Sequence, residues 1–382
     1  MTPPVPCSSF PTSLALLNSR APRALRPPPP WLAKTLTIAT AAARLGIRLV
    51  TSVGTVGYEA ALHAALKAGG EVDIILQKAS HEQLLDDIVS VFEQPSISIS
   101  ILPGRATPTM RDEAVAASAE ALVGVHIRRR GTMARVLREA FERTGIRVAI
   151  WPDGPEESGQ GSVPVPHLEQ TDWGRRLVDS AKEEGDCPLW SADWFAGRVS
   201  EAPGTLAICR WSASPLTGAL LSHFTRAQPG PWPGQSRAHW LEDLRHGGAR
   251  MDRSAPAALA RILREGRIRA GSRLIRGGWP VVSLTGVHPE RIARLHRYQT
   301  HLMRWDFEPF GLVFRRDILK DLGARPVIHA PSAAYMRLPP SLRPFFQKCE
   351  PPRCDYRAEE EWRIPGDLDL TQLPRESWRV FP

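Results

Sequence analysis

Residues 51 to 70 read TSVGTVGYEAALHAALKAGG, and the order of elements around this stretch indicates the fold class. The apolar run Ile47–Ser52 that leads into it predicts a buried strand, and Tyr58–Ala68 predicts an alanine-rich helix. Gly54 and Gly57 lie in the tight turn between the two. Backbone N–H groups at the start of such a helix are free and aligned with its dipole, so they form a site for an anion. Small residues in the turn let a phosphate approach the backbone.

The alternation of strand and helix extends over the whole first part of the chain. The predicted helices are Trp31–Leu45, Tyr58–Ala68, His81–Phe92, Met110–Ser118 and Thr132–Arg143, and the predicted strands are Ile47–Ser52, Val72–Leu76, Ile97–Leu102, Ala121–Ile127 and Ile146–Trp151. Strands that alternate with helices in this way form βαβ units. We therefore predict an α/β fold: a Rossmann-like parallel sheet with helices on both faces, followed by a second α+β domain.

Gly131 and Thr132 form a second candidate site for an anion. They follow the predicted strand Ala121–Ile127 and stand at the start of the next predicted helix. Open α/β sheets bind ligands outside the carboxyl ends of their parallel strands, and both glycine turns lie at such ends.

These residues carry a resemblance to a known family. Thr51–Gly70 resembles the S-G-x-x-x-G-x-D-x-x-A-H-x-x-A-L-x-x-G-G signature of the DNA-processing protein A and SLOG superfamily of Rossmann-like domains. Leu14–Arg20 is similar to that family's opening strand and turn, and Arg111 followed by Ala121–Thr132 is similar to its later phosphate loop. The resemblance covers residues 11–152. Six residues fall on or near the marked positions of the signature: Ser52, Gly54, Gly57, His63, Gly69 and Gly70.

The resemblance implies binding of a nucleotide, a nucleotide-derived signal or single-stranded DNA. The residues that it implies for binding are Ser19, Arg20, Ser52, Gly54, Thr55, Gly57, Arg111, Gly131 and Thr132. The chain departs from the pattern at Asn18, where a glycine is expected, at Tyr58-Glu59, which replace the usual aspartate region, and in the proline-rich loop Ala21–Pro30. A Rossmann-like scaffold that has lost its ligand is the alternative interpretation.

The second part of the chain predicts an irregular linker at 153–216 and an α+β domain at 217–371. In that domain Ser254 is expected to cap a helix that ends at Glu265, with Gly266 just beyond its end. The strand-like runs are Leu220–Arg226, Trp279–Leu284, Gly311–Phe314 and Pro326–His329.

Four motifs of this domain resemble, in their order, the AbiGi-like group of phage-resistance proteins and, more loosely, DarT-like ADP-ribosyltransferases. They are His223-Phe224-Thr225, Ile262–Ile268, Val282–Thr285 and Glu361-Trp362-Arg363. The resemblance implies NAD as the substrate, with His223 on the ribose, Ser283 or Thr285 orienting it, and Glu361 stabilising an oxocarbenium-like transition state. The alternative is structural: a satisfied histidine at a strand end, and a solvated acidic run at 359–361.

Composition narrows the function further. The 382 residues favour two domains, and the net charge of +9 fits a polyanionic partner. The arginines are spread over both halves, however, and only Arg128–Arg130 form a tight cluster. The five cysteines form no paired C-x-x-C sites, which favours a reducing compartment and no metal site. No apolar run is long enough to cross a membrane and none is typical of a signal peptide, so we expect a cytoplasmic protein.

The sequence leaves two classes of function open. In the first, a nucleotide bound near Ser52–Gly57 and Gly131 controls an ADP-ribosyltransferase-like effector domain in prokaryotic defence or stress response. That function requires His223, a serine or threonine, and Glu361 around one pocket. In the second, the protein binds nucleotides or single-stranded DNA without catalysis. That function requires a basic surface beside the glycine turns, formed by Arg20, Arg111 and Arg128–Arg130.

Overall fold

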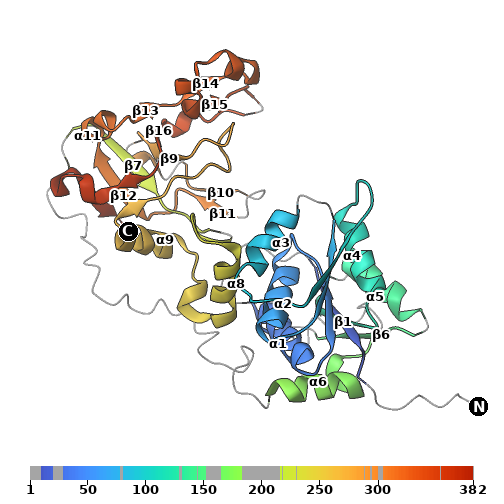
Figure 1. Ribbon diagram of the computed structural model, residues 1–382. Helices are drawn as coiled ribbons and strands as arrows, with labels where there is room; N and C mark the ends of the chain where they lie inside the picture. The colour runs from blue at the N-terminus through green and yellow to red at the C-terminus, as the bar shows by residue number, and fades with distance from the viewer. Residues whose placement is uncertain are drawn as a thin grey trace, which may run out of the picture. The chain divides into compact units, whose positions relative to one another are not determined.

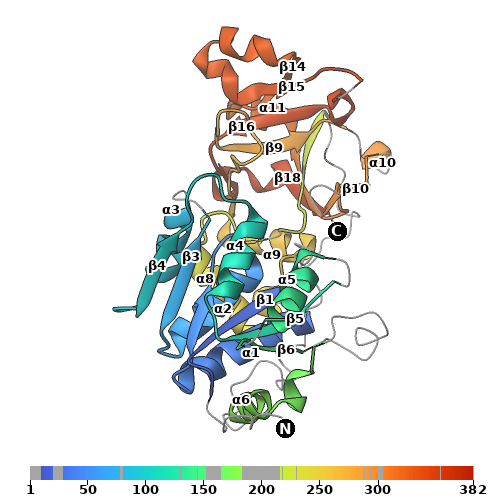
Figure 2. The same ribbon diagram turned by 90° about the vertical axis from the view of Figure 1, so that its right-hand side faces the viewer.

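The computed structural model of the chain divides into two compact units (Figures 1 and 2). The first unit is Met1–Arg198 with Gln235–Met251, and the second is Val199–Gly234 with Asp252–Pro382. The residues that the structure describes are 10–19, 29–77, 81–128, 131–143, 145–151, 165–182, 216, 218–228, 230–287, 289–292, 295–299, 304–352 and 354–381.

The first unit is built on a parallel sheet of six strands in the order β4-β3-β2-β1-β5-β6. The strands are β1 (Ser13–Asn18), β2 (Arg48–Thr51), β3 (Val72–Leu76), β4 (Ile97–Ile101), β5 (Ala121–His126) and β6 (Arg147–Ile150). The chain runs outward from β1 to β4 and then returns to add β5 on the other side of β1. This is a doubly wound order with its topological switch point between β1 and β5.

Helices cover both faces of this sheet, as the sequence predicts. The helices are α1 (Pro30–Arg44), α2 (Val56–Lys67), α3 (Glu82–Val89), α4 (Pro108–Ala117), α5 (Thr132–Phe141), α6 (Asp172–Lys182) and α8 (Arg237–His246), with the 3-10 turns η3 (Leu168–Gln170) and η5 (Gly248–Met251). Leu14 and Leu16 of β1 belong to the core that α1, α2 and α3 cover, whereas Ala15 and Leu17 belong to the core under α4 and α5. Because both faces are buried, the strands read as continuous apolar runs. The predicted Rossmann-like fold class is confirmed.

Two helices lie where the sequence predicts something else. α6 falls within 153–216, which we expected to be an irregular linker, and it buries Leu177 and Val178 in the core beside α1. α8 falls within 217–371, which we expected to form the second domain, yet it belongs to the first unit and packs against α2 and α3. Trp240 is the anchor of α8, at 2% exposed.

The second unit contains an antiparallel sheet of six strands in the order β13-β16-β9-β7-β12-β18. These are β7 (Leu220–Phe224), β9 (Val281–Thr285), β12 (Gly311–Arg315), β13 (Arg325–Pro326), β16 (Glu361–Pro365) and β18 (Trp378–Phe381). α9 (Ala255–Glu265) packs on its core through Leu259. As predicted, Ser254 caps α9 by accepting the Ala257 N–H, and Gly266 ends it at φ +62. The α+β class of this unit is confirmed.

Short elements complete the second unit. Its two-stranded sheets pair β8 (Arg267–Ile268) with β17 (Leu368–Asp369), β10 (Arg297–Gln299) with β11 (Arg304–Asp306), and β14 (Ile328–Ala330) with β15 (Phe346–Lys348). The remaining helical elements are α10 (Pro289–Ile292), α11 (Arg316–Asp321), η6 (Ser332–Arg337), η7 (Pro340–Phe345), η8 (Arg357–Glu359), η9 (Leu370–Gln372) and η10 (Arg375–Ser377). The predicted strand Pro326–His329 is divided between β13 and β14, which belong to different sheets. None of the helices that the structure describes is both long and apolar enough to span a membrane.

Candidate functional site

The end of β1 lies between the starts of two helices. Ser19, the residue after β1, donates its N–H to the His126 carbonyl at 2.7 Å, and its Oγ accepts the Arg128 N–H at 2.9 Å. A Cβ on Gly131, at the start of α5, would stand 3.7 Å from the same Oγ. On the other side, a Cβ on Gly57 would stand 2.9 Å from Nδ2 of Asn18, so only glycine fits there without a shift. The two predicted glycine turns therefore meet at the end of β1, at the switch point of the sheet.

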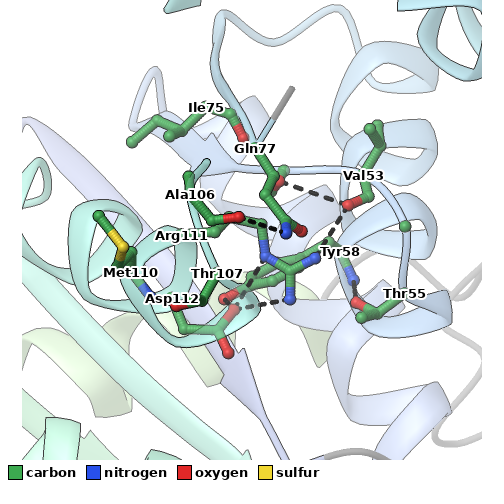
Figure 3. A network of polar contacts seen from close by, with 12 residues as sticks. Val53, Thr55, Tyr58, Ile75, Gln77, Ala106, Thr107, Met110, Arg111 and Asp112 are labelled. Atoms are coloured by element: carbon green, nitrogen blue, oxygen red, sulfur yellow. Dashed lines mark hydrogen bonds and ion pairs between the residues drawn. The ribbon is translucent and has the colours of Figure 1, made fainter. Parts of the chain in front are cut away.

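The turn between β2 and α2 is held by hydrogen bonds inside the protein (Figure 3). The Oγ of Ser52, which is fully buried, donates to the Ile75 carbonyl at 2.6 Å. Gly54 has φ +93, a conformation that favours glycine. Thr55 caps α2, since its Oγ1 accepts the Tyr58 N–H at 3.4 Å. Ser52 thus shapes the turn from within. The N–H groups of Val56 and Gly57 at the start of α2 have no acceptor in the helix and are the groups left for a ligand.

Arg111 lies beneath this turn and not on the surface (Figure 3). It is 3% exposed, and its Nε and Nη2 donate to Oδ1 of Asp112 at 3.0 and 2.7 Å. Its Nη1 donates to the carbonyl of Val53 at 3.2 Å, and its guanidinium lies 5.0 Å from the centre of the Tyr58 ring. Tyr58 donates its hydroxyl to the same Asp112 oxygen at 3.1 Å. Burial, followed by the charge of Asp112, raises the pKa of Tyr58, which keeps this hydroxyl a donor. Arg111 therefore positions the turn from α4.

The start of α5 offers a simpler anion site. Gly131 is its N-cap, with φ −88 and ψ 165 and no side chain to satisfy the helix. Its carbonyl accepts the N–H groups of Ala134 and Arg135. The N–H groups of Thr132 and Met133 have no acceptor within the helix. Of the predicted basic surface, Arg111 is buried, whereas Arg20, Arg129 and Arg130 lie outside the described residues.

Asn18 and Glu59, two residues at which the chain departs from the signature, form hydrogen bonds inside the first unit. Asn18 donates through Nδ2 to Oγ1 of Thr35 at 3.2 Å, and its buried Oδ1 has no hydrogen-bond partner among the residues that the structure describes. Glu59, which is fully buried, accepts the Gly54 N–H at 2.8 Å and forms an ion pair with Arg237 of α8. Burial raises the pKa of Glu59, while the Arg237 guanidinium and the Gly54 N–H act in the opposite direction.

His63, a marked position of the signature, lies one helical turn beyond Glu59 and is 2% exposed. Its Nε2 lies 3.6 Å from the Glu242 carboxylate of α8, and its ring meets Phe92 edge-on at 5.2 Å. Burial lowers the pKa of His63 to about 4, although Glu242 acts to raise it. The ring is therefore neutral at pH 7, and its contact with Glu242 is a polar contact and not an ion pair.

This burial predicts a loss of stability in acid. Between pH 6.5 and 4 the unfolded chain protonates His63 while the folded chain does not, so stability falls as the pH falls. The expected loss between pH 7 and 5 is about 2 kcal/mol from this residue. Urea unfolding of the first unit at both pH values, in the wild type and in His63→Leu, measures it. The variant should lose that part of the pH dependence, and parallel pH profiles would contradict the assignment.

In the second unit, pairing places Ser283, Thr285 and Glu361 on one face of the sheet. Across β9 and β16, Ser283 lies opposite Arg363 and Thr285 opposite Glu361, and Ser222 of β7 lies opposite Thr285. Alternation along β7 directs His223 to the other face. The strand register therefore does not gather the predicted catalytic trio on one face.

His223 instead bonds to the backbone of β9. Its Nδ1 lies 2.9 Å from the carbonyl oxygen of Ser283, not from the hydroxyl. Burial lowers the pKa of His223 to about 4, and Arg226 adds to this effect. The ring is neutral at pH 7, and because a carbonyl only accepts, Nδ1 carries the proton. This bond supplements the single β-bridge between β7 and β9.

Arg363 is a structural residue with every donor group engaged. It is 1% exposed and donates to both carboxylate oxygens of Glu361, at 2.9 and 3.1 Å. It also donates to the carbonyls of Pro344 and Phe346 and to the side chain of Gln347. The Glu361 carboxylate is thereby fixed in one orientation.

Glu359 is the residue of this region that the sequence did not single out. Burial, followed by the charge of Glu361, raises the pKa of Glu359 to about 7, and Asp306 adds to the effect. Arg297 lies 3.4 Å from its carboxylate and acts in the opposite direction. The Thr285 hydroxyl donates to the backbone carbonyl of Glu359 at 2.5 Å, which anchors the residue beside β9. Within the acidic run 359–361, the carboxyl groups of Glu359 and Glu361 therefore lie in different environments.

The described residues contain no group of three histidine, cysteine, aspartate or glutamate side chains that could hold a metal ion. Cys349 and Cys354 are free thiols, and the other three cysteines lie outside the described residues.

No protein-family model matches the chain, and no curated protein matches it. A similar solved structure is the X-ray structure of DNA processing protein A from Streptococcus pneumoniae, at 18% sequence identity and a TM-score of 0.29. The match covers 44% of this chain and 56% of that chain, so this chain spans little more than half of that protein. Similarity at this level carries no argument about function. The Rossmann-like assignment rests on the strand order and on the helices that cover both faces of the sheet.

Proposed function

We propose that the first unit binds a nucleotide or another phosphate-bearing ligand at the end of β1. One observation carries the proposal: the Asn18-Ser19 end of β1 lies directly against Gly57 and Gly131, at the starts of α2 and α5. Two helix starts then direct free N–H groups toward one place, and phosphates bind readily to such groups. Both starts also carry the positive end of a helix dipole.

The residues at this place have distinct roles in the proposal. N–H groups of Thr132 and Met133 hold one phosphate, and the N–H of Gly57 approaches a second charged group. The buried Oδ1 of Asn18, which lacks a partner among the described residues, accepts a hydrogen bond from a ligand hydroxyl or amine. Arg111 and Ser52 position the β2–α2 turn without touching the ligand. A single DNA strand presents the same phosphate chemistry, so the test includes it.

Gly131→Asp tests this proposal. The backbone of Gly131 is extended, and a Cβ there would meet the Arg128 carbonyl at 3.4 Å, an ordinary contact. Aspartate is a preferred N-cap, so we expect unchanged or slightly raised stability. Its carboxylate would repel a phosphate by roughly 1–4 kcal/mol at about 4 Å, which weakens binding about 5- to 1000-fold. Titration calorimetry with ADP, NAD and an oligothymidylate strand measures this effect.

Gly131→Asn is the matched control, because it has nearly the same size and is also a preferred N-cap but carries no charge. We expect Gly131→Asn to bind the same ligand more tightly than Gly131→Asp. Equal affinity of both variants and the wild type would overturn the proposed site. Binding of the strand but not of ADP or NAD would identify DNA as the ligand.

We further propose that the second unit transfers the ADP-ribosyl group of NAD. The proposal is supported by the order of motifs, which resembles that of AbiGi-like proteins and DarT-like transferases. The proposal includes a role in prokaryotic defence or stress response. The specific observation in its favour is that Glu359, with its pKa raised to about 7, lies beside Glu361. A carboxyl group whose pKa is raised toward neutrality is suited to act as a general base.

The chemistry assigns one step to each carboxyl group. The bond between ribose and nicotinamide breaks, and nicotinamide leaves as a neutral molecule with the electron pair. Glu361, oriented by Arg363, stabilises the positive charge that develops on the ribose. The oxygen of a hydroxyl group or water then bonds to the ribose carbon that nicotinamide leaves, and Glu359 accepts the proton of that oxygen. In this mechanism His223 supports β9 through the Ser283 carbonyl, and its ribose-binding role stays a prediction from the resemblance.

Nicotinamide release from NAD by the full chain tests the transferase. We expect release by the wild type and its loss in Glu361→Gln, which keeps the size of the side chain and one of the two acceptor oxygens for Arg363 but removes the charge. If the wild type binds ADP but releases no nicotinamide from NAD, the proposed transferase activity is wrong and the protein only binds its ligand.

A further inference from the structure

A carboxylate of the chain itself already occupies one N–H of the β2–α2 turn. Oε1 of Glu59 accepts the Gly54 N–H at 2.8 Å, while Oε2 accepts Nε of Arg237 at 2.6 Å. Nη2 of Arg237 contacts the same oxygen. Glu59 is fully buried, and Arg237 comes from a segment 178 residues farther along the chain. The turn is thus linked to α8 by two consecutive charged contacts.

Arg237 has a further contact with a neighbouring helix, α3, and one within α8. Its backbone N–H donates to Oδ2 of Asp87 in α3 at 2.7 Å, and its guanidinium stacks 4.4 Å from the Trp240 ring centre. In the middle of α8, Glu242 meets His63 at 3.6 Å and Lys67 at 4.0 Å. Successive turns of α2, at Glu59, His63 and Lys67, therefore contact the first half of α8.

Along the chain, α8 lies between two segments of the second unit. The residues before it, Val199–Gly234, and those after Met251 belong to the second unit, whereas α8 and η5 belong to the first. A change in the docking of α8 therefore acts on the segment that joins the two units covalently.

We propose that an anion bound at the β2–α2 turn displaces the Glu59 carboxylate from the Gly54 N–H and so weakens the docking of α8 through Arg237. The proposal rests on the proposed ligand site of the first unit and adds its regulation. A phosphate and a carboxylate compete for the same donors, and at close range they repel each other. Linkage is reciprocal, so if the anion loosens α8, a change that loosens α8 also favours binding of the anion.

Leu244→Ala is the decisive variant, because it changes no charge. Leu244 is 1% exposed on α8, and its truncation weakens the docking of the helix without touching the turn. We expect faster hydrogen exchange in 235–251 of the ligand-free variant. We also expect ADP affinity to rise about 5-fold or more. In the wild type, saturating ADP should itself raise exchange in 235–251. Leu244→Val is the milder variant if Leu244→Ala does not fold.

Leu177→Ala is the matched control. Leu177 is also 1% exposed and lies in the same core, but it belongs to α6, which packs against α1. Its loss should lower stability and leave ADP affinity unchanged. Glu59→Gln should raise ADP affinity and abolish the response of 235–251 to ADP.

The outcomes separate the two proposals. Two outcomes would overturn the coupling but leave the proposed ligand site intact. In the first, ADP binds but hydrogen exchange in 235–251 does not change. In the second, Leu244→Ala binds ADP with the affinity of the wild type. No binding of ADP, NAD, inorganic phosphate or the oligothymidylate strand by the wild type would overturn the site, and the coupling with it.

Discussion

Replacing Arg111 by methionine is expected to lower the free energy of unfolding of the first unit by about 3–5 kcal/mol. The change leaves the Asp112 carboxylate, whose side chain is 10% exposed, without the guanidinium that donates two hydrogen bonds to its Oδ1. It also removes the donor to the Val53 carbonyl, so the β2–α2 turn loses its support. Urea unfolding, followed by hydrogen exchange in α2 and α4, measures the loss for this unit separately from the second.

The double variant Arg111→Met/Asp112→Leu is the control for this prediction. It removes both charges together, and replacing a buried pair by apolar residues often costs little. We therefore expect the double variant to be more stable than Arg111→Met alone. If Arg111→Met cost less than about 1 kcal/mol and still abolished ADP binding, Arg111 would be a ligand-binding residue and its positioning role would be wrong.

The fold of the first unit was predictable because its strands are buried on both faces. An apolar run such as Ile47–Ser52 differs from the alternating pattern of a solvent-facing strand, and the glycines after it mark the turn. The placement of α6 was not predictable in the same way. Its apolar residues are few, and the glycine-, proline- and acid-rich surroundings conceal a helix whose stability comes from packing against α1.

The candidate site was predictable in position but not in the role of each residue. Ser52 and Arg111 lie beside the glycine turn, because a strand end and a helix fix their positions. The sequence could not reveal that the Ser52 hydroxyl donates to the Ile75 carbonyl, or that the Arg111 guanidinium donates to Asp112 and to the Val53 carbonyl. A polar residue at a strand end has many candidate partners, and only the tertiary structure selects one.

Long-range charge contacts were the least predictable part. Nothing in the local pattern links Glu59 to Arg237, and nothing links Glu359 to Asp306 and Arg297. For Glu359 the available signal was the acidic run 359–361 itself. Like charges so close along a chain raise one pKa when burial removes water from them. The run itself contains no measure of that burial, so a solvated face was an equally good interpretation.

Glu359→Gln is expected to lower nicotinamide release from NAD by about 100- to 10,000-fold, the usual loss when a general base is removed. Because Glu359 accepts a proton, its ionised form is the active one, so wild-type turnover should rise with pH and be half-maximal near pH 7. The residual activity of Glu359→Gln should not follow this profile. Steady-state rates from pH 5 to pH 9 measure both properties.

Glu361→Gln provides the sharper test of how the two carboxyl groups interact. The charge of Glu361 is the second cause, after burial, of the raised pKa of Glu359. Its removal should therefore move the midpoint of any residual pH profile below pH 7, because only burial and Asp306 still oppose ionisation of Glu359. Glu376→Gln, at an exposed carboxyl group of the same unit, should change neither rate nor midpoint. A midpoint that stays near pH 7 in Glu361→Gln would assign the titrating group to another residue, since the profile of Glu359 must respond to the charge beside it.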